Sequence, residues 1–410
     1  MVLDYGLDEF VIERLIVKKS VLILFAIASG FAVGNLYFIQ PLLDIIAGDL
    51  GTTATENGWL VTAVQIGYAL GIITWLPLGD VRSRKHLVPI MVTVAGLSQV
   101  AIGLSHAYLP LILALFAVGF TTISGQILVP LTGELSDDSN RGKNVSFVVS
   151  GMIIGILGAR VVSGGLADLL SWHATFIVIG GANLVMAIAL YRVIPVLPAK
   201  PKVAYRKLAA GTFTLLRANP SVFGAMAING LSMLIFSIVW TAITFLLSGP
   251  KFEVSAGAIG AWGLFGVVGA LAARNAGRLI DKGKGDLASK VGWVLVAVSL
   301  VIGSFAEQSL VYLAIQLIVM DAAMQGIGVT NQTKLISMFP DSRSRVNAGY
   351  VTVNFIGAAI GSAVASALWP STGWNGLMLI CAGISIAALG LWVWNRKYLN
   401  RIAAASPVGR

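Results

Sequence analysis

The chain has 410 residues, of which 57% are hydrophobic and only 11% are charged. Soluble globular proteins carry about 25% charged residues, so this composition excludes a soluble domain and indicates an integral membrane protein. The single cysteine, Cys381, excludes an internal disulfide framework and a cysteine-built metal cluster. The start of the chain carries Asp4, Asp8, Glu9 and Glu13, unlike the basic region that opens a cleavable signal peptide.

Twelve apolar runs approach or exceed the length of about 20 residues that a membrane-spanning helix needs. In chain order, the expected spans are 20–46, 55–79, 86–105, 109–135, 144–170, 172–195, 220–247, 254–278, 288–307, 309–337, 345–369 and 373–397. The sequence therefore predicts an all-α integral membrane protein with twelve transmembrane helices. These form an N-terminal bundle, 20–195, and a C-terminal bundle, 220–397. The remaining segments are an N-terminal tail, 1–19, a linker, 196–219, and a C-terminal tail, 398–410.

Positive charge is concentrated on one side of the membrane in this arrangement. All but three of the 28 lysines and arginines fall in the termini, the linker or every second loop, and the exceptions are Arg160, Lys251 and Arg274. Basic segments mark the cytoplasmic side, so both termini and the linker are expected in the cytosol. Topology then explains the net charge of +10. Because the charge is accounted for in this way, nucleic acid is disfavoured as a partner. The linker is expected to be either a basic amphipathic helix on the inner leaflet or a solvated tether.

The two bundles are related by an internal repeat. Residues 202 positions apart match in type, as in the pairs Arg141 and Arg343, Gly155 and Gly357, and Trp172 and Trp374. Two six-helix repeats joined by a cytosolic linker are the construction of many secondary transporters. In such proteins the substrate is held near the midplane of the membrane, between the repeats.

Short basic turns follow the second and eighth spans and read "LPLGDVRSRK" and "GRLIDKGKG". They resemble the loop signature of the major facilitator superfamily, although Leu76, Val81 and Ser83 depart from it in the first copy. The strings "NLYFIQPLLD", "GILGARVVSG" and "NQTKL" resemble a bacterial subgroup of drug or metabolite exporters. The resemblance covers about residues 20–400 and implies two pseudo-symmetric six-helix bundles.

The resemblance also implies a conformational latch at the cytosolic side, made by the charged residues of these turns. The retained residues are Asp80, Arg84, Lys85, Gly277, Asp281 and Lys282. A carboxylate such as Asp80 is favoured at the positive end of a neighbouring helix by about 0.3–1 kcal/mol. The alternative is that the basic residues of the turns only enforce the topology.

Two charged residues near the middle of spans have no charged counterpart in the repeat. Arg160 corresponds to Ser362, and Asp321 corresponds to Gly119. A charge at the centre of a membrane costs about 2.5–3.5 kcal/mol on insertion scales and usually marks a functional site. Asp321 could carry a coupling proton with Arg160 as its modulator, the two could form a static ion pair, or they could recognise a charged substrate.

In the superfamily, spans 1, 4, 7 and 10 line the substrate cavity. Their polar and aromatic residues are the candidate substrate-binding set: Asn35, Tyr37, Gln40, Gln126, Asn229, Trp240, Thr241, Gln325, Asn331 and Gln332. Any of these side chains could instead serve helix–helix hydrogen bonding. A mixed cavity with one carboxylate suits a neutral amphipathic or a cationic solute. The arginine often found in span 4 of the superfamily has no counterpart in "FAVGFTTISGQILVPL".

Other chemistries lack candidate residues. His86, His106 and His173 fall at or beyond span ends, and "GRLIDKGKG" lacks the spacing of a phosphate-binding loop, so we expect no metal, cofactor or enzymatic activity. We predict an alternating-access transporter of the bacterial inner membrane, monomeric, surrounded by lipids, exporting a small amphipathic or cationic compound in exchange for protons. The first alternative is transport of a polar metabolite such as a sugar or amino acid. The second is a transport-inactive membrane sensor.

Overall fold

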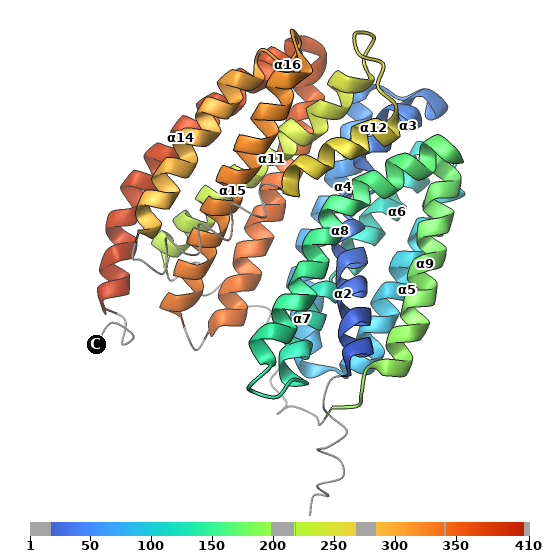
Figure 1. Cartoon of the computed structure of the whole chain (residues 1–410), viewed down its shortest axis with the longest axis vertical. Helices are drawn as coiled ribbons and strands as arrows, with labels where there is room; N and C mark the ends of the chain where they lie inside the picture. The colour runs from blue at the N-terminus through green and yellow to red at the C-terminus, as the bar shows by residue number, and fades with distance from the viewer. Residues whose placement is uncertain (1–17, 198–216, 218, 268–283, 340–341, 406–410) are drawn as a thin grey trace, which may run out of the picture.

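The computed structural model describes residues 18–197, 217, 219–267, 284–339 and 342–405. The described chain is helical, and its elements fall into two halves (Figure 1). The N half contains α2 (Lys19–Gly34), η2 (Gln40–Leu42), α3 (Leu43–Leu50), α4 (Ala54–Val81), α5 (Arg84–Gly103), α6 (Tyr108–Thr121), α7 (Ser124–Glu134), α8 (Arg141–Leu169) and α9 (Trp172–Val193). The C half contains α11 (Pro220–Ser248), α12 (Ala256–Ala261), η3 (Trp262–Phe265), α14 (Gly285–Gly303), α15 (Leu310–Met338) and α16 (Arg343–Ala405).

These elements account for the expected spans in three ways. Within the described residues, nine helical segments are long and apolar enough to cross a membrane. One of them holds spans 11 and 12 together, because α16 runs through a turn at Gly373, where φ is +58°. Spans 1 and 8 are instead broken, into α2–η2–α3 and into α12–η3, and the expected end of span 8 lies outside the described residues.

The internal repeat is visible in how the helices cross. In the N half α2 crosses α8 at Gly30 and Gly155, and in the C half α11 crosses α16 at Gly230 and Gly357. A side-chain carbon on Gly155 would overlap the backbone of Gly30, and one on Gly357 would overlap the backbone of Gly230. Small residues allow this close approach of membrane helices. The matching glycines therefore serve the same packing function in both halves.

The break in span 1 is built into the interior of the N half. Helix α2 ends at Gly34, and a 3-10 turn containing Pro41 follows. The Asn35 amide donates to the Thr122 hydroxyl at 2.8 Å, next to the break between α6 and α7, and its oxygen accepts from Gln99 at 2.8 Å. Non-helical backbone at membrane depth is tolerated where it is buried in protein or lines a cavity. The turn brings Tyr37 and Gln40 to the centre of the molecule.

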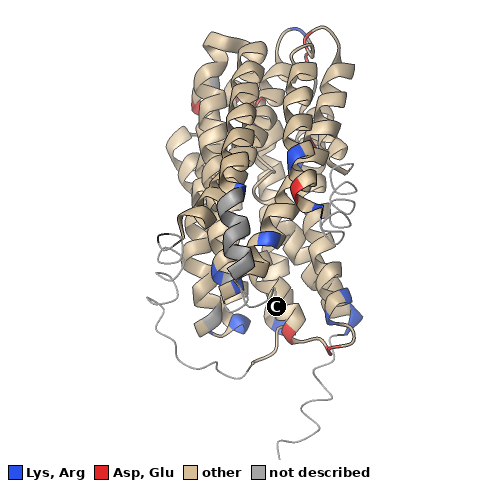
Figure 2. Ribbon diagram, turned by 90° about the vertical axis from the view of Figure 1, so that its left-hand side faces the viewer, with Lys and Arg blue, Asp and Glu red and all other residues tan. Residues whose placement is uncertain are grey.

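Charged residues are concentrated at one end. Figure 2 shows most lysines and arginines in the lower part of the molecule, towards the marked C-terminus, while the helical body above is almost free of charge. We call this end the terminal end and the opposite end, with α3 and α12, the far end. Because basic residues mark the cytoplasmic side, the terminal end is predicted to face the cytosol.

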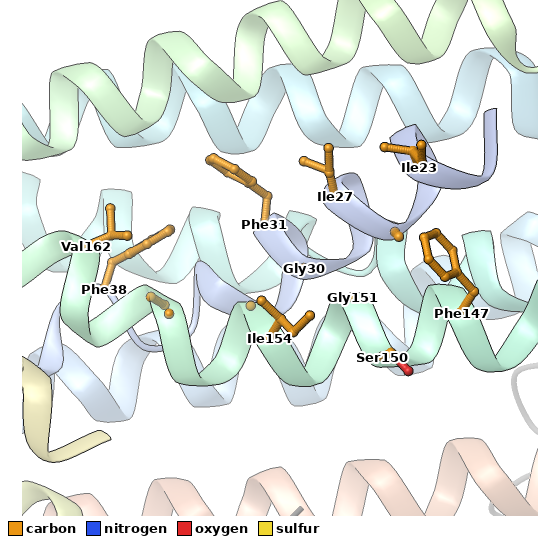
Figure 3. A pocket seen from close by; sticks show the side chains of 14 residues that line it. Ile23, Ile27, Gly30, Phe31, Phe38, Phe147, Ser150, Gly151, Ile154 and Val162 are labelled. Carbon is orange, nitrogen blue, oxygen red and sulfur yellow. The ribbon is translucent and has the colours of Figure 1, made fainter. Parts of the chain in front are cut away.

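A groove of about 390 Å³ lies on the outside of the N half between α2 and α8. Ile23, Ile27 and Phe31 of α2 and Phe147 and Ile154 of α8 form its walls (Figure 3). Ser150 is its one polar side chain, and its hydroxyl is bonded to its own helix at the Ser146 carbonyl, 2.8 Å away. This lining matches lipid acyl chains and offers no group for specific polar recognition.

The floor of this groove provides a test of helix packing. Gly155 and Gly158 lie in the same helix, but a side-chain carbon at Gly158 meets nothing within 4 Å. Gly155→Ala should destabilise the protein by about 1–3 kcal/mol, because the methyl group forces α2 and α8 apart. Gly158→Ala should be neutral or stabilising by up to about 1 kcal/mol, through helix propensity. Unfolding midpoints in detergent, followed by tryptophan fluorescence, measure both, and equal midpoints would contradict the close crossing.

Candidate functional site

A central cavity of about 310 Å³ lies between the halves. Its N-half wall comes from α2, α4, α7 and α8, and its C-half wall from α11, α15, α16 and the stretch just after η3. Arg160 of α8 and Asp321 of α15 are the charged side chains among its described lining residues. The structure therefore brings together the two residues that the repeat comparison singled out.

Arg160 is 3% exposed and is held on three sides. Its Nε donates to Gln40 Oε1 at 2.7 Å, and its guanidinium lies 4.6 Å from the centre of the Tyr37 ring and 4.1 Å from that of Trp240. Cation–π contacts of desolvated arginines are worth about 2 kcal/mol or more. Since Tyr37 belongs to the N half and Trp240 to the C half, the arginine joins the two halves.

The backbone of span 8 packs directly on Arg160. A side-chain carbon on Gly263 would lie 3.3 Å from Arg160 Cδ, and one on Gly260 would overlap the Arg160 carbonyl. Glycine at these two positions lets η3 and the end of α12 approach α8 closely enough to cover the arginine. The site is thus closed on this side by backbone from the C half.

Asp321 is 6% exposed and lies near the middle of α15. Its Oδ1 has no hydrogen-bond partner among the described residues, and neither has Trp240 Nε1. Within the described residues no ion pair of 4.0 Å or less joins Asp321 to Arg160. The static ion pair considered from the sequence is therefore not formed in this conformation, and both charges face the cavity.

Seven of the ten candidate substrate-binding residues lie at the cavity or touch its arginine. Tyr37, Gln126, Asn229, Gln325 and Gln332 line the cavity, while Gln40 and Trp240 contact Arg160. The other three lie away from it: Asn35 in the polar network of the N half, and Thr241 and Asn331, both buried outside the cavity lining.

The sequence-based selection missed cavity residues from spans 2 and 11. Tyr68 of α4 accepts a hydrogen bond from Gln126 at 3.2 Å, and Asn354 of α16 accepts one from Asn229 at 2.8 Å. Tyr350, also of α16, donates to the Gly328 carbonyl at 3.0 Å. Polar residues in the middle of spans 2 and 11 were the available signal. These residues were not selected because only spans 1, 4, 7 and 10 were expected to line the cavity.

The described latch candidates contact partners within the N half. Arg84 pairs with Glu134 at 2.6 Å and also donates from Nε to the Gly79 carbonyl at 3.0 Å. Lys85 lies 5.7 Å from the centre of the Tyr191 ring. The Asp80 side chain, and Gly277, Asp281 and Lys282, lie outside the described residues. A latch across the halves at the terminal end stays a prediction.

Hydrogen bonds between the halves gather towards the far end. In the described part of the chain, every hydrogen bond between the halves uses an N-half residue from Gln40–Gln65 or Asp168. Asp168 Oδ2, at the end of α8, accepts from the Ser255 hydroxyl at 2.7 Å and from the Gly257 amide at 3.0 Å, at the start of α12. The Thr244 hydroxyl of α11 donates to the Gln40 carbonyl at 3.1 Å. These bonds close the far end over the cavity.

Two helical halves around a central cavity, closed at one end by hydrogen bonds, are the construction of many secondary transporters. The chain belongs to the Major Facilitator Superfamily, whose sequence pattern matches residues 24–290. The prediction from the basic turns is thereby confirmed at the level of the superfamily, and the protein is a transporter rather than an enzyme.

Comparisons with individual proteins agree with this assignment. The chain is 38% identical over 387 residues to the uncharacterized transporter YgaY of Escherichia coli O157:H7, covering 94% of this chain and 98% of that one. It is 27% identical over 164 residues, 39% of each chain, to the inner membrane transport protein YnfM of Escherichia coli K12.

Two solved structures share the fold. An inward-facing, unoccupied bacterial homologue of the human lysosomal transporter Spinster has a TM-score of 0.74 at 14% identity, covering 98% of this chain and 99% of that one. The D323A mutant of the nucleoside transporter NupG has a TM-score of 0.75 at 14% identity, covering 91% and 99%.

The Asp168 contact predicts how easily the far end opens. A carboxylate at a helix N-terminus contributes about 0.3–1 kcal/mol, so Asp168→Asn should raise the population open at the far end about two- to fivefold. Spin labels at Leu170 and Lys251, in a Cys381→Ser background, report the separation of the halves there.

Asp44→Asn is the matched control for this variant. Asp44 is an exposed carboxylate in α3 with no hydrogen bond or ion pair to any described residue. Identical distance distributions for Asp168→Asn and Asp44→Asn would show that the Asp168 contact does not hold the far end closed.

Proposed function

We propose that this transporter works by alternating access with Asp321 as the proton carrier and Arg160 as its modulator. One observation supports this most directly: a buried carboxylate faces the cavity, and its Oδ1 has no hydrogen-bond partner among the described residues. An uncompensated charge at this depth costs about 2.5–3.5 kcal/mol. Protonation would neutralise that charge, and a cationic group would compensate it by forming an ion pair. Proton and cation therefore compete for one oxygen pair.

Such competition favours exchange. A solute with a cationic group displaces the proton when the cavity opens to one side, and the proton displaces the solute when it opens to the other. With the terminal end in the cytosol, the closed far end corresponds to a cavity ready to load from inside. This supports proton-driven efflux across the bacterial inner membrane by a monomer embedded in lipid.

The cavity also supports the second candidate, transport of a polar metabolite. Gln126, Asn229, Gln325 and Gln332 present amide groups to the cavity beside Phe236. At about 310 Å³ the cavity lies at the lower limit of the 300–1,000 Å³ usual for ligand pockets. A small solute with both apolar and polar parts fits this lining best.

Asp321→Asn tests the coupling. The probe is the solute that gives the largest thermal shift in a screen of amphipathic cations and small metabolites. One proton moving through 100 mV supplies about 2.3 kcal/mol, or about a 50-fold concentration ratio. In proteoliposomes under an imposed pH gradient, the native protein should accumulate the probe, whereas Asp321→Asn should bring it only to equilibrium, because asparagine carries no proton.

Two controls accompany this variant. Exchange of labelled for unlabelled probe without a gradient, at a probe concentration high enough to saturate the variant, should persist in Asp321→Asn, which shows that the protein is folded. Glu307→Gln removes a partly exposed carboxylate before α15, which accepts only from the Asn375 amide at 3.4 Å among the described residues, and should leave accumulation unchanged. Full gradient-driven accumulation by Asp321→Asn would reject Asp321 as the proton carrier.

A further inference from the structure

The two charges in the cavity form no ion pair of 4.0 Å or less with any described residue. Arg160 Nη2 and Asp321 Oδ1 have no hydrogen-bond partner among the described residues, although both side chains are more than nine-tenths buried. Buried polar atoms in folded proteins are normally satisfied by protein or by ordered water. An unsatisfied donor and an unsatisfied acceptor in one cavity indicate the groups that its ligand carries.

Arg160 is held by partners other than Asp321. Gln40 fixes the guanidinium through Nε, and the Tyr37 and Trp240 rings cover it at 4.6 and 4.1 Å. Asp321 approaches from α15 in the other half and stops beyond 4.0 Å. The site therefore presents a separated positive and negative charge, one from each half, with a formal sum of zero.

This arrangement selects among charged solutes. A simple cation would satisfy Asp321 and leave Arg160 uncompensated, and a simple anion would do the reverse. A zwitterion would satisfy both charges, since burying a charge is tolerated when it is paired. It would also connect α8 of the N half to α15 of the C half, so it would bind best when both halves surround the cavity.

The rest of the lining describes the remainder of the solute. Met152, Met233 and Met324, together with Phe236 and Phe355, surround the polar groups. Methionine side chains adapt to varied apolar shapes, which suits side chains of differing outline. The volume of about 310 Å³ limits the solute to a small molecule.

We propose that the cavity binds a small zwitterion with an apolar side chain, of the α-amino-acid class, with its carboxylate on Arg160 and its ammonium group on Asp321. The inference rests on the proposed function and narrows its substrate. The ammonium group and the coupling proton would share Asp321, which accounts for their exchange.

Binding to the purified protein in nanodiscs tests the proposal by calorimetry. The probes are L-leucine and L-phenylalanine, each with the amine that lacks its carboxylate (isopentylamine, phenethylamine) and the acid that lacks its ammonium group (4-methylpentanoate, 3-phenylpropanoate). At least one amino acid should bind about tenfold or more tightly than both its matching amine and its matching acid, a difference in binding free energy of about 1.4 kcal/mol.

Variants assign each charge to its partner. In Arg160→Gln the amino acid should bind no better than the amine, and in Asp321→Asn no better than the acid. Asn229→Ala, which removes a neutral amide from the cavity wall, should change all three affinities alike and preserve the preference for the zwitterion. Thermal unfolding midpoints identify any variant that is misfolded, and Arg160→Lys then replaces Arg160→Gln, with a smaller loss of preference expected.

Each outcome decides the proposal. An amine that binds as tightly as its amino acid would show a cation site, and a panel without any binding would also overturn the zwitterion. If the screened probe is still driven by a pH gradient through Asp321, the proposed function survives that failure. If the amino acids bind with the expected charge dependence but no gradient moves them, the proposed coupling fails and the zwitterion site stands.

Discussion

The contact on which this structure depends is the enclosure of the Arg160 guanidinium by Gln40, Tyr37 and Trp240. Lipid offers no partners for polar groups, so a charge at membrane depth has to be satisfied by the protein. The break after Gly34 turns Tyr37 and Gln40 inward, and the glycines of span 8 let the opposite half cover the arginine. One buried cation thereby contacts the broken part of span 1, the backbone of span 8 and one wall of the cavity.

The halves meet through contacts of very different strength. Within each half, backbone packs directly on backbone where two helices cross. These crossings lie at Gly30 and Gly155 in the N half and at Gly230 and Gly357 in the C half. Between the halves, the far end is held by hydrogen bonds such as those of Asp168 to Ser255 and Gly257, which are open to solvent. Exposed polar contacts of this kind are worth little individually. The seam at the far end therefore combines exposed hydrogen bonds with close packing of the α12 backbone on α8, at Gly164 against Ala256 and at Gly260 against Arg160.

The sequence by itself determined the class of the protein. Hydropathy located the spans because a helix in lipid must be apolar over about 20 residues. The count of twelve spans places nearly all lysines and arginines on one side of the membrane, as the positive-inside rule requires. The repeat of 202 residues singled out Arg160 and Asp321 as charges without a charged counterpart in the other half. Their counterparts, Ser362 and Gly119, serve helix packing instead. The Ser362 hydroxyl lies 2.7 Å from that of Thr62 across the seam between the halves, and Gly119 makes room for the Val64 backbone.

Only the tertiary structure decided which polar residues face the cavity. Asn35 and Asn229 look alike in the sequence, yet Asn35 bonds to Thr122 inside the N half while Asn229 lines the cavity with Asn354. The direction of a side chain in a broken helix depends on where the helix stops, and that depends on neighbours that are distant in the chain. Likewise, no local pattern places Trp240 over Arg160, because the two lie in different halves and meet only when those halves pack together.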